Sequence, residues 1–110
     1  MLQYRPHDDP KSLGALTENQ LQVLTHALRF PKAERVAYST CSVLDEENEL
    51  LVQRALATDA GAAFELEKCL PWWPRRGRLL FPGAENCLRT TWDDGTIGFF
   101  LAVFRRRASA

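Results

Sequence analysis

The stretch RVAYSTCSVLDEENELLVQRAL places one cysteine, Cys41, directly after a short apolar run and a few residues ahead of a group of acids. A thiol placed where a strand meets a loop can act as a nucleophile, because its thiolate is the reactive form and nearby positive groups raise the thiolate fraction. Free cysteines are also commonly just packed inside proteins, without any chemical role. Position alone therefore leaves a catalytic and a structural interpretation open.

A second group of residues has the composition of a nucleic-acid contact. Two tryptophans are interleaved with three arginines, and such side chains can stack on bases and hold phosphates. The alternative is a loop that packs on its own tryptophans while its arginines are solvated, because a basic cluster alone is weak support for RNA binding. The residues are Trp72, Trp73, Arg75, Arg76 and Arg78.

The remaining residues that could do chemistry do not form a pattern. Cys41, Cys69 and Cys87 make no CxxC pair and no zinc spacing, and their odd number argues against a disulfide framework. We therefore predict free thiols and no metal site. His7 and His26 have no partner at a catalytic spacing.

The elements that must position Cys41 follow an α/β order. Residues 1–12 read as a loop or arm, and the apolar spacing from Leu13 to Phe30, stopped by Pro31, predicts an amphipathic helix. The stretch RVAYST predicts a strand that lies in a parallel sheet and is buried on both of its faces. The next helix is expected to be capped by Asp45 and to face inward with Leu51, Val52, Ala55 and Leu56.

The second half of the chain predicts two further strands. Phe64 and Leu66 alternate in AAFELEKCL, and both faces of GTIGFFLAVFRRR are apolar. Between them, residues 70–92 predict a long ordered excursion. We expect one domain over residues 1–110, with the fold at 13–105, a tail at 106–110 and at least two parallel strands. In such sheets ligands bind beyond the carboxyl ends of the strands, which is where Cys41 lies.

Composition narrows the class of protein. The 110 residues allow one domain at most, and 45% hydrophobic with 25% charged residues is ordinary globular composition. The 14 basic and 14 acidic residues leave a net charge of zero, which favours neither a nucleic-acid binder nor an acidic partner. No apolar run approaches a membrane span and the start lacks the apolar core of a signal peptide, so we expect an intracellular protein.

Three linked blocks resemble one enzyme family. YSTCS followed by EENE, then FPGAENCLR, then GFFLAVFRR, are similar in order and spacing to the RsmB-like (Sun/Fmu) RNA cytosine-C5 methyltransferases. The similarity runs from about Leu13 onward and is greatest to the branch that methylates large-subunit ribosomal RNA. It implies the carboxyl-terminal portion of a Rossmann-like class I methyltransferase fold, with a mixed sheet and flanking helices. The cofactor it implies is S-adenosylmethionine.

The resemblance also implies roles for single residues. Cys41 matches the family's nucleophile, whose thiolate adds to C6 of cytosine so that C5 can accept a methyl group. The target base must be flipped out or single-stranded. Thr40 and Ser42 would orient the turn. For Glu47, Asn48 and Glu49, which would close the start of the adjacent helix, capping and favourable interaction with the helix dipole explain these residues at least as well as direct contact with the substrate does.

The departures from the family pattern predict a partial domain. The glycine-rich loop and the acidic residue that bind the cofactor are not present, and neither is the upstream block with the second cysteine. The expected partners are ribosomal RNA and either a missing amino-terminal half or a second copy, with no metal and no membrane. We expect the isolated chain to associate and not to bind S-adenosylmethionine.

Two classes of function therefore stay open. One is an RNA methyltransferase in which Cys41 acts when the missing half is present, located in the nucleus or nucleolus of a eukaryote and otherwise in the cytoplasm. The other is a non-catalytic remnant or a module that binds RNA or pairs with a partner chain.

Overall fold

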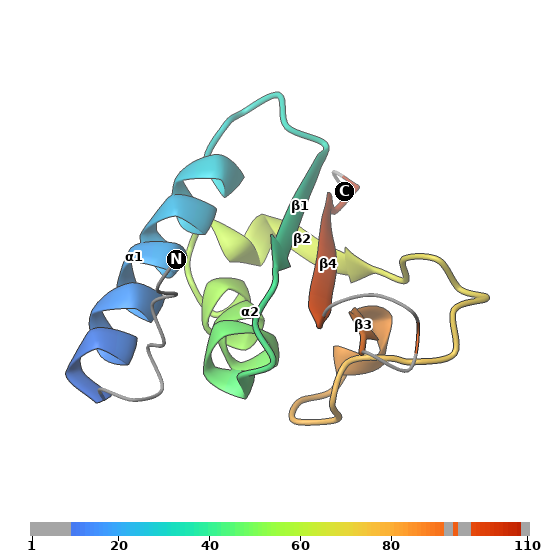
Figure 1. Cartoon of the computed structure of the whole chain (residues 1–110). Helices are drawn as coiled ribbons and strands as arrows, with labels where there is room; N and C mark the ends of the chain where they lie inside the picture. Colours follow the sequence, from blue (N-terminus) through green and yellow to red (C-terminus); the bar gives the residue numbers. More distant parts are fainter. Residues whose placement is uncertain (1–9, 92–93, 95–97, 109–110) are drawn as a thin grey trace.

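The computed structural model describes residues 10–91, 94 and 98–108. The expected arm at residues 1–9 and the last two tail residues lie outside this range. Two helices and four strands follow one another along the chain (Figure 1). They are α1 (Pro10–Leu28), β1 (Arg35–Thr40), α2 (Glu49–Leu56), β2 (Phe64–Glu67), β3 (Leu88–Thr90) and β4 (Phe99–Arg106).

The four strands form one sheet in which β4 lies between β1 and β2. All the pairs are antiparallel: Thr40 of β1 faces Phe100, Phe64 of β2 faces Arg106, and Thr90 of β3 faces Phe99. β1 and β2 run in the same direction because both oppose β4. Two strands with the same direction are therefore present, as predicted, but they are not neighbours, because β4 lies between them. The parallel sheet expected around RVAYST is thus not found among the described residues, whose strand pairs are antiparallel.

β4, the central strand, is apolar on both of its faces. Phe100, Ala102 and Phe104 are fully buried under the helices, and the alternate row beginning at Phe99 is half-buried on the opposite face. The strand predicted from GTIGFFLAVFRRR is confirmed, and it extends to Arg106, one residue into the expected tail.

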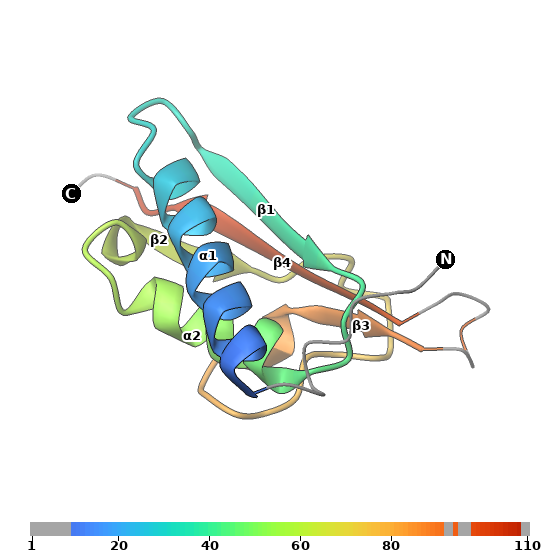
Figure 2. The same cartoon turned by 60° about the vertical axis from the view of Figure 1, so that its left-hand side comes forward.

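Both helices pack on the same face of the sheet (Figure 2). Leu24 and Leu28 of α1 join the core, as do Leu51, Val52 and Ala55 of α2. Leu56 packs against this core while only partly buried. α1 begins at Pro10, ahead of the expected Leu13. Val23, one of the apolar residues whose spacing predicted this helix, is 64% exposed and therefore does not lie on its buried face. Within the described residues, neither helix has the length and apolar character needed to cross a membrane.

β1 is an edge strand whose burial alternates along its length. Val36, Tyr38 and Thr40 face the helices, whereas Arg35, Ala37 and Ser39 are exposed. The prediction that RVAYST is buried on both faces is therefore wrong, because the described helices cover one face of the sheet only. The outer edge of β1 pairs with no other described strand. Association of the isolated chain through this edge stays a prediction.

The excursion between β2 and β4 is ordered around short elements. A 3₁₀ turn at Ala84–Asn86 leads into β3, and Arg76 forms an isolated bridge with Leu88 of β3. The sequence did not predict β3, which is three residues long. Trp92, the end of the expected excursion, lies outside the described residues.

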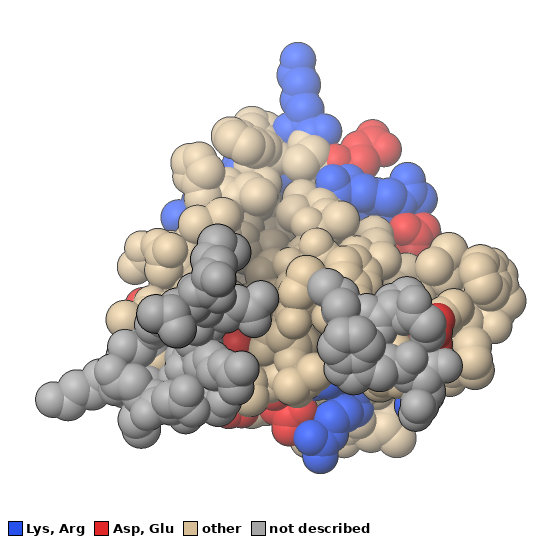
Figure 3. Space-filling view, in the orientation of Figure 1, with Lys and Arg blue, Asp and Glu red and all other residues tan. Residues whose placement is uncertain are grey.

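The charged side chains at one end of the sheet are largely paired with one another. Figure 3 shows lysines and arginines gathered at the top of the view, above the loop from α1 to β1, with acidic side chains beside them. Arg35 pairs with Glu67, and Arg105 pairs with Glu65 and Glu67 across the strands. Exposed pairs of this kind contribute little to stability, because water and salt screen the two charges.

Candidate active site at Cys41

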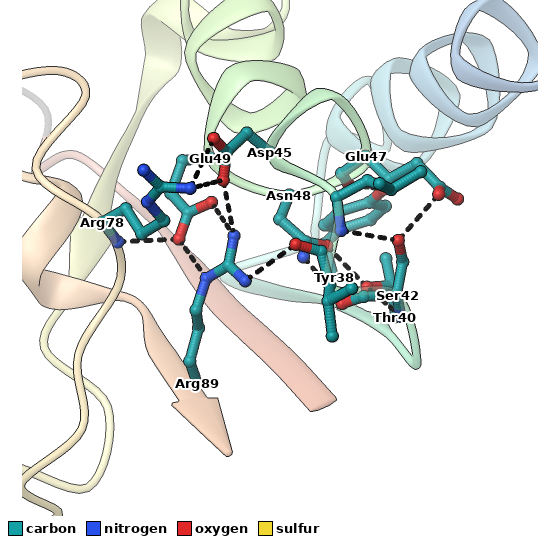
Figure 4. A network of polar contacts seen from close by, with 11 residues as sticks. Tyr38, Thr40, Ser42, Asp45, Glu47, Asn48, Glu49, Arg78 and Arg89 are labelled. Atoms are coloured by element: carbon teal, nitrogen blue, oxygen red, sulfur yellow. Dashed lines mark hydrogen bonds and ion pairs between the residues drawn. The ribbon is translucent and has the colours of Figure 1, made fainter. Parts of the chain in front are cut away.

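Cys41 follows the last residue of β1, and its side chain is exposed. This is the carboxyl end of the strand, as the sequence predicted. The thiol therefore stands at the rim of the sheet, where a base could reach it. Its neighbours Thr40 and Ser42, also predicted as site residues, are half-buried and point into a polar network (Figure 4).

Ser42 closes the turn that carries the thiol. Its backbone N–H donates to Thr40 Oγ1 over 3.2 Å, and its own hydroxyl accepts from the N–H of Leu44 over 3.0 Å. The same hydroxyl donates to Glu47 Oε2 over 2.7 Å. These bonds fix the backbone on the carboxyl side of Cys41, which supports the expectation that Thr40 and Ser42 orient the turn.

Glu47 is a buried carboxylate that ties the turn to both helices. It is 6% exposed, and its other oxygen accepts a hydrogen bond from Gln20 of α1 over 3.0 Å. The Tyr38 hydroxyl donates to the backbone carbonyl of Glu47 over 2.6 Å, and burial raises the pKa of Tyr38. Glu47 ends a 3₁₀ turn, Asp45–Glu47, so the helix that Asp45 was expected to cap begins later, at Glu49.

Asn48 lies between the 3₁₀ turn and α2 and is fully buried. Its side chain accepts from the Thr40 hydroxyl over 2.5 Å and donates to the carbonyl of Ser42 over 2.8 Å. It makes no side-chain capping bond to α2. The capping explanation considered from the sequence is therefore wrong for the Asn48 side chain.

Glu49 and Arg89 form a buried ion pair beside the turn. The Glu49 carboxylate is 0% exposed and accepts from Arg89 Nη2 over 2.5 Å, from Arg89 Nε over 2.6 Å and from the backbone N–H of Arg78 over 2.7 Å. Burial alone would raise the pKa of Glu49, but these hydrogen bonds outweigh it and hold the pKa below its usual value. Arg89 also donates to the carbonyl of Val43 over 3.1 Å, which anchors the turn from its other side.

The three arginines expected to hold phosphates have different environments. Arg76 uses all of its N–H groups, in five hydrogen bonds to the backbone carbonyls of Cys69, Leu70, Trp73, Glu85 and Asn86. Arg75 pairs with Asp94, and Arg78 pairs with Asp45. The side chains of Arg75 and Arg78 remain 42% and 61% exposed.

The two tryptophans of this loop also differ. Trp72 is 73% exposed, whereas the indole N–H of Trp73 donates to the carbonyl of Arg89 over 3.0 Å. Their rings meet edge to face, with centroids 6.2 Å apart. The loop therefore packs partly on itself and still presents one indole to solvent.

Cys69 and Cys87 are buried thiols. Burial raises the pKa of Cys69 and raises that of Cys87 to about 12. Neither can supply much thiolate near neutral pH, because the thiolate fraction falls about tenfold for each unit by which the pKa exceeds the pH. Of the three thiols, Cys41 is the one placed for reaction.

We expect native alkylation to distinguish the three cysteines. Iodoacetamide at about pH 8 should modify Cys41 and leave Cys69 and Cys87 intact, because the buried pair is shielded and protonated. Peptide mass spectrometry after a timed quench measures the result. Urea provides the control, since all three thiols should react once the chain is unfolded. Modification of Cys87 at the rate of Cys41 in the native protein would contradict this assignment.

The turn that carries Cys41 is not a glycine-rich loop of the kind that holds a nucleoside cofactor. β1 is the strand that leads through a loop into a helix, and the loop from Cys41 to Asn48 contains no glycine, so it offers no close backbone approach to a bound nucleoside. Nor do the described residues hold a group of three or more acidic, cysteine or histidine side chains placed to bind a metal ion.

Sequence reasoning missed the residues that hold the turn in place. Arg89 was not singled out, and Asn48 and Glu49 were assigned as readily to helix capping as to the site. The ion pair of Glu49 and Arg89 joins residues 40 apart in the chain, which no local pattern reveals. One available signal was the run of polar residues Glu47, Asn48 and Glu49 at the inward-facing start of a helix.

The chain is similar to ribosomal RNA (cytosine-C(5))-methyltransferases of several organisms. It is 52% identical over 95 residues to the 28S rRNA (cytosine-C(5))-methyltransferase of Mus musculus, covering 86% of this chain. It is 43% identical over 98 residues to the 25S rRNA (cytosine-C(5))-methyltransferase NSUN5 of Arabidopsis thaliana, covering 89% of this chain. No family model matches the chain.

A solved structure has the same fold over most of the chain. The methyltransferase homologue from Pyrococcus horikoshii matches 88% of this chain with a TM-score of 0.74 and 27% identity. The predicted Rossmann-like methyltransferase class is confirmed, although the described strand pairs are antiparallel rather than mixed. The chain spans 20% of the mouse enzyme, 17% of the Arabidopsis enzyme and 33% of the solved chain. It is therefore homologous to one part of the large-subunit rRNA cytosine-C5 methyltransferases.

Proposed function

We propose that this chain supplies the nucleophile of a ribosomal RNA cytosine-C5 methyltransferase, and that Cys41 is that nucleophile. The observation that carries the proposal is an exposed thiol at the carboxyl end of β1, on a turn whose flanking residues are fixed by buried side chains. The similarity to rRNA (cytosine-C(5))-methyltransferases gives the reaction class.

The chemistry explains why a thiol is needed. C5 of cytosine is a poor nucleophile. When the Cys41 thiolate forms an S–C6 bond, the C5–C6 double bond breaks and its electron pair makes C5 nucleophilic. After C5 has taken a methyl group, loss of the C5 proton restores the double bond and expels the thiolate. Cys41 thus returns to its starting state without an external reductant or oxidant.

The methyl donor of this family is S-adenosylmethionine, which supplies an electrophilic methyl group on a sulfonium. We propose that it binds mainly to protein segments other than the described residues, because the loop that leads from β1 into α2 contains no glycine. For a eukaryotic protein, this substrate favours the nucleolus, where ribosomal RNA is processed.

A segment exchange tests the proposal. In the mouse 28S rRNA methyltransferase, the matched segment of 95 residues is replaced by that of this chain. We expect the exchanged enzyme to methylate its ribosomal RNA substrate, measured by tritium transfer from labelled S-adenosylmethionine. A folded exchanged enzyme that binds both the cofactor and RNA but transfers no methyl group would favour a non-catalytic module instead.

We further propose that Arg75 and Arg78, on the Trp/Arg loop at residues 70–78, contact RNA phosphates. Both arginine side chains are more than 40% exposed, so their guanidinium groups are accessible to a phosphate. Arg76 is left out, because a phosphate contact would break its bonds to backbone carbonyls. The exposed indole of Trp72 is placed to stack on a base.

Salt dependence tests this contact. Replacing Arg75 and Arg78 by alanine should weaken RNA binding by the exchanged enzyme and flatten the plot of log affinity against log salt, by about 0.7 per lost contact to single-stranded RNA. Fluorescence anisotropy over a salt series gives the slope. Arg54→Ala is the matched control, since Arg54 is similarly exposed and pairs with Glu18 on the helices. An unchanged slope in the double variant would mean that the loop is only solvated.

A further inference from the structure

The Asn48 side chain holds both residues that flank Cys41. Its carbonyl oxygen accepts from the Thr40 hydroxyl over 2.5 Å, and its amide group donates to the Ser42 carbonyl over 2.8 Å (Figure 4). Asn48 is 0% exposed. One buried amide is thus hydrogen-bonded to the residue on either side of Cys41.

This arrangement is not what helix initiation requires. An asparagine that caps a helix accepts a hydrogen bond from the backbone N–H two or three residues later, and Asn48 makes no such side-chain bond. A capping role could also be filled by serine, threonine or aspartate. An amide is needed here because the site must accept from a hydroxyl and donate to a carbonyl at once, and a carboxylate cannot donate.

The remaining bonds of the turn make the position of the thiol rigid. Thr40 Oγ1 donates to Asn48 and accepts from the Ser42 N–H, so Asn48 orients the hydroxyl that holds the turn. Ser42 is held in addition by the buried Glu47. A nucleophile displaced by about 1 Å can lose about 100-fold in rate, so fixing this turn has a direct kinetic consequence.

We propose that Asn48 is a positioning residue that directs the Cys41 thiol toward its substrate without touching the substrate itself. This inference rests on the proposed function, because a thiol needs a fixed direction only if it must reach one atom of a base. The hydrogen-bonded turn can be tested separately from catalysis.

The first test follows a fluorine label on Cys41. The full chain is modified at this exposed thiol with a trifluoromethyl reagent, and its ¹⁹F spectrum is recorded. Asn48→Asp removes the donor to Ser42, and Thr40→Val removes the hydroxyl with little change of shape. We expect a single ¹⁹F line from the labelled chain with the natural sequence. Both variants should broaden or split this line, whereas Thr40→Ser, which keeps the hydroxyl, should leave a single line.

Thr25→Val is the matched control. Thr25 is also a buried threonine, 7% exposed, and its hydroxyl bonds to carbonyls within α1 far along the chain from Cys41. A general loss of stability would lower the melting temperature of this variant without changing the line of the label. A single unshifted line in both Asn48→Asp and Thr40→Val would overturn the proposal.

The second test measures kinetics in the exchanged mouse enzyme. Thr40→Val should lower kcat by up to about 100-fold with KM nearly unchanged, and Thr40→Ser should restore it. If the enzyme with this chain's own sequence transfers no methyl group, the proposed function fails while the fluorine result still decides the inference. If that enzyme is active and Thr40→Val leaves kcat unchanged, the positioning role is wrong.

Discussion

Replacing Cys41 by serine should abolish methyl transfer by an enzyme that contains this chain. Serine keeps the size and turn geometry but cannot supply a thiolate, and the C5–C6 bond of cytosine is not activated without one. Removal of an enzyme nucleophile costs about 10⁴-fold or more in kcat. The measurement is tritium transfer to ribosomal RNA by the segment-exchanged mouse enzyme.

A covalent trap gives the same prediction a second readout. RNA that contains 5-fluorocytosine has no C5 proton to lose after methylation, so the S–C6 bond persists and the protein–RNA adduct survives denaturing electrophoresis. The adduct should form with Cys41 present and vanish in Cys41→Ser. A persistent adduct in Cys41→Ser would show that another group is the nucleophile.

Cys69→Ala and Cys87→Ala are the matched controls. Both thiols are buried and protonated, so their loss should leave turnover nearly unchanged. The removed sulfur leaves a small cavity, and a loss of about 1 kcal/mol in stability is the order expected for one buried group of this size. Loss of turnover in either folded variant would contradict the assignment of the reactive thiol to Cys41.

The strands and helices were predictable where the local pattern was strong. The double apolar face of β4 and the stripe of α2 each depend on spacings within one element, so the sequence alone revealed them. The direction of β4 was not predictable, because a strand with two apolar faces packs equally well in either direction. Which strand lies in the centre is decided by the chain connections and not by any one stretch.

The candidate site, too, was predictable only where its residues form a local pattern in the sequence. Cys41 could be found because its place after a strand and the neighbouring blocks are local features. The role of Asn48 could not be found, because asparagine before a helix is also the ordinary capping residue. Arg89 lies in β3, a strand that the sequence did not predict, and only the folded chain brings its guanidinium to Glu49.

The pair of Glu49 and Arg89 should dominate the stability of this region. Glu49 is 0% exposed and the Arg89 side chain is 13% exposed, so removing Arg89 leaves the Glu49 carboxylate buried without a cation, whereas removing Glu49 leaves Arg89 paired with Asp45 over 3.1 Å. Breaking a buried pair so that one charge is left without a partner costs about 3–5 kcal/mol. We expect Arg89→Met to lower the free energy of unfolding by this order and Glu49→Gln to lower it by less, measured by urea denaturation of the chain.

The double variant separates the pair from simple loss of packing. Glu49→Gln combined with Arg89→Met leaves no uncompensated charge, so it should cost clearly less than the sum of the single changes. Glu18→Gln is the surface control, since Glu18 forms an exposed pair with Arg54 and should cost less than about 1 kcal/mol. Additive losses in the double variant would mean that the two charges do not depend on each other.

Acid provides an independent test of the same pair. The pKa of Glu49 is lower in the folded protein than its ordinary value of 4.5, so the unfolded chain binds the proton more tightly. The stabilisation by Glu49 is therefore complete above about pH 4.5 and is lost as the pH falls through the folded pKa. Unfolding free energies measured from about pH 7 down to pH 3 should fall more steeply for the natural sequence than for Glu49→Gln, in which this group no longer titrates. Equal slopes for the two proteins would show that Arg89 does not hold Glu49 in its charged form.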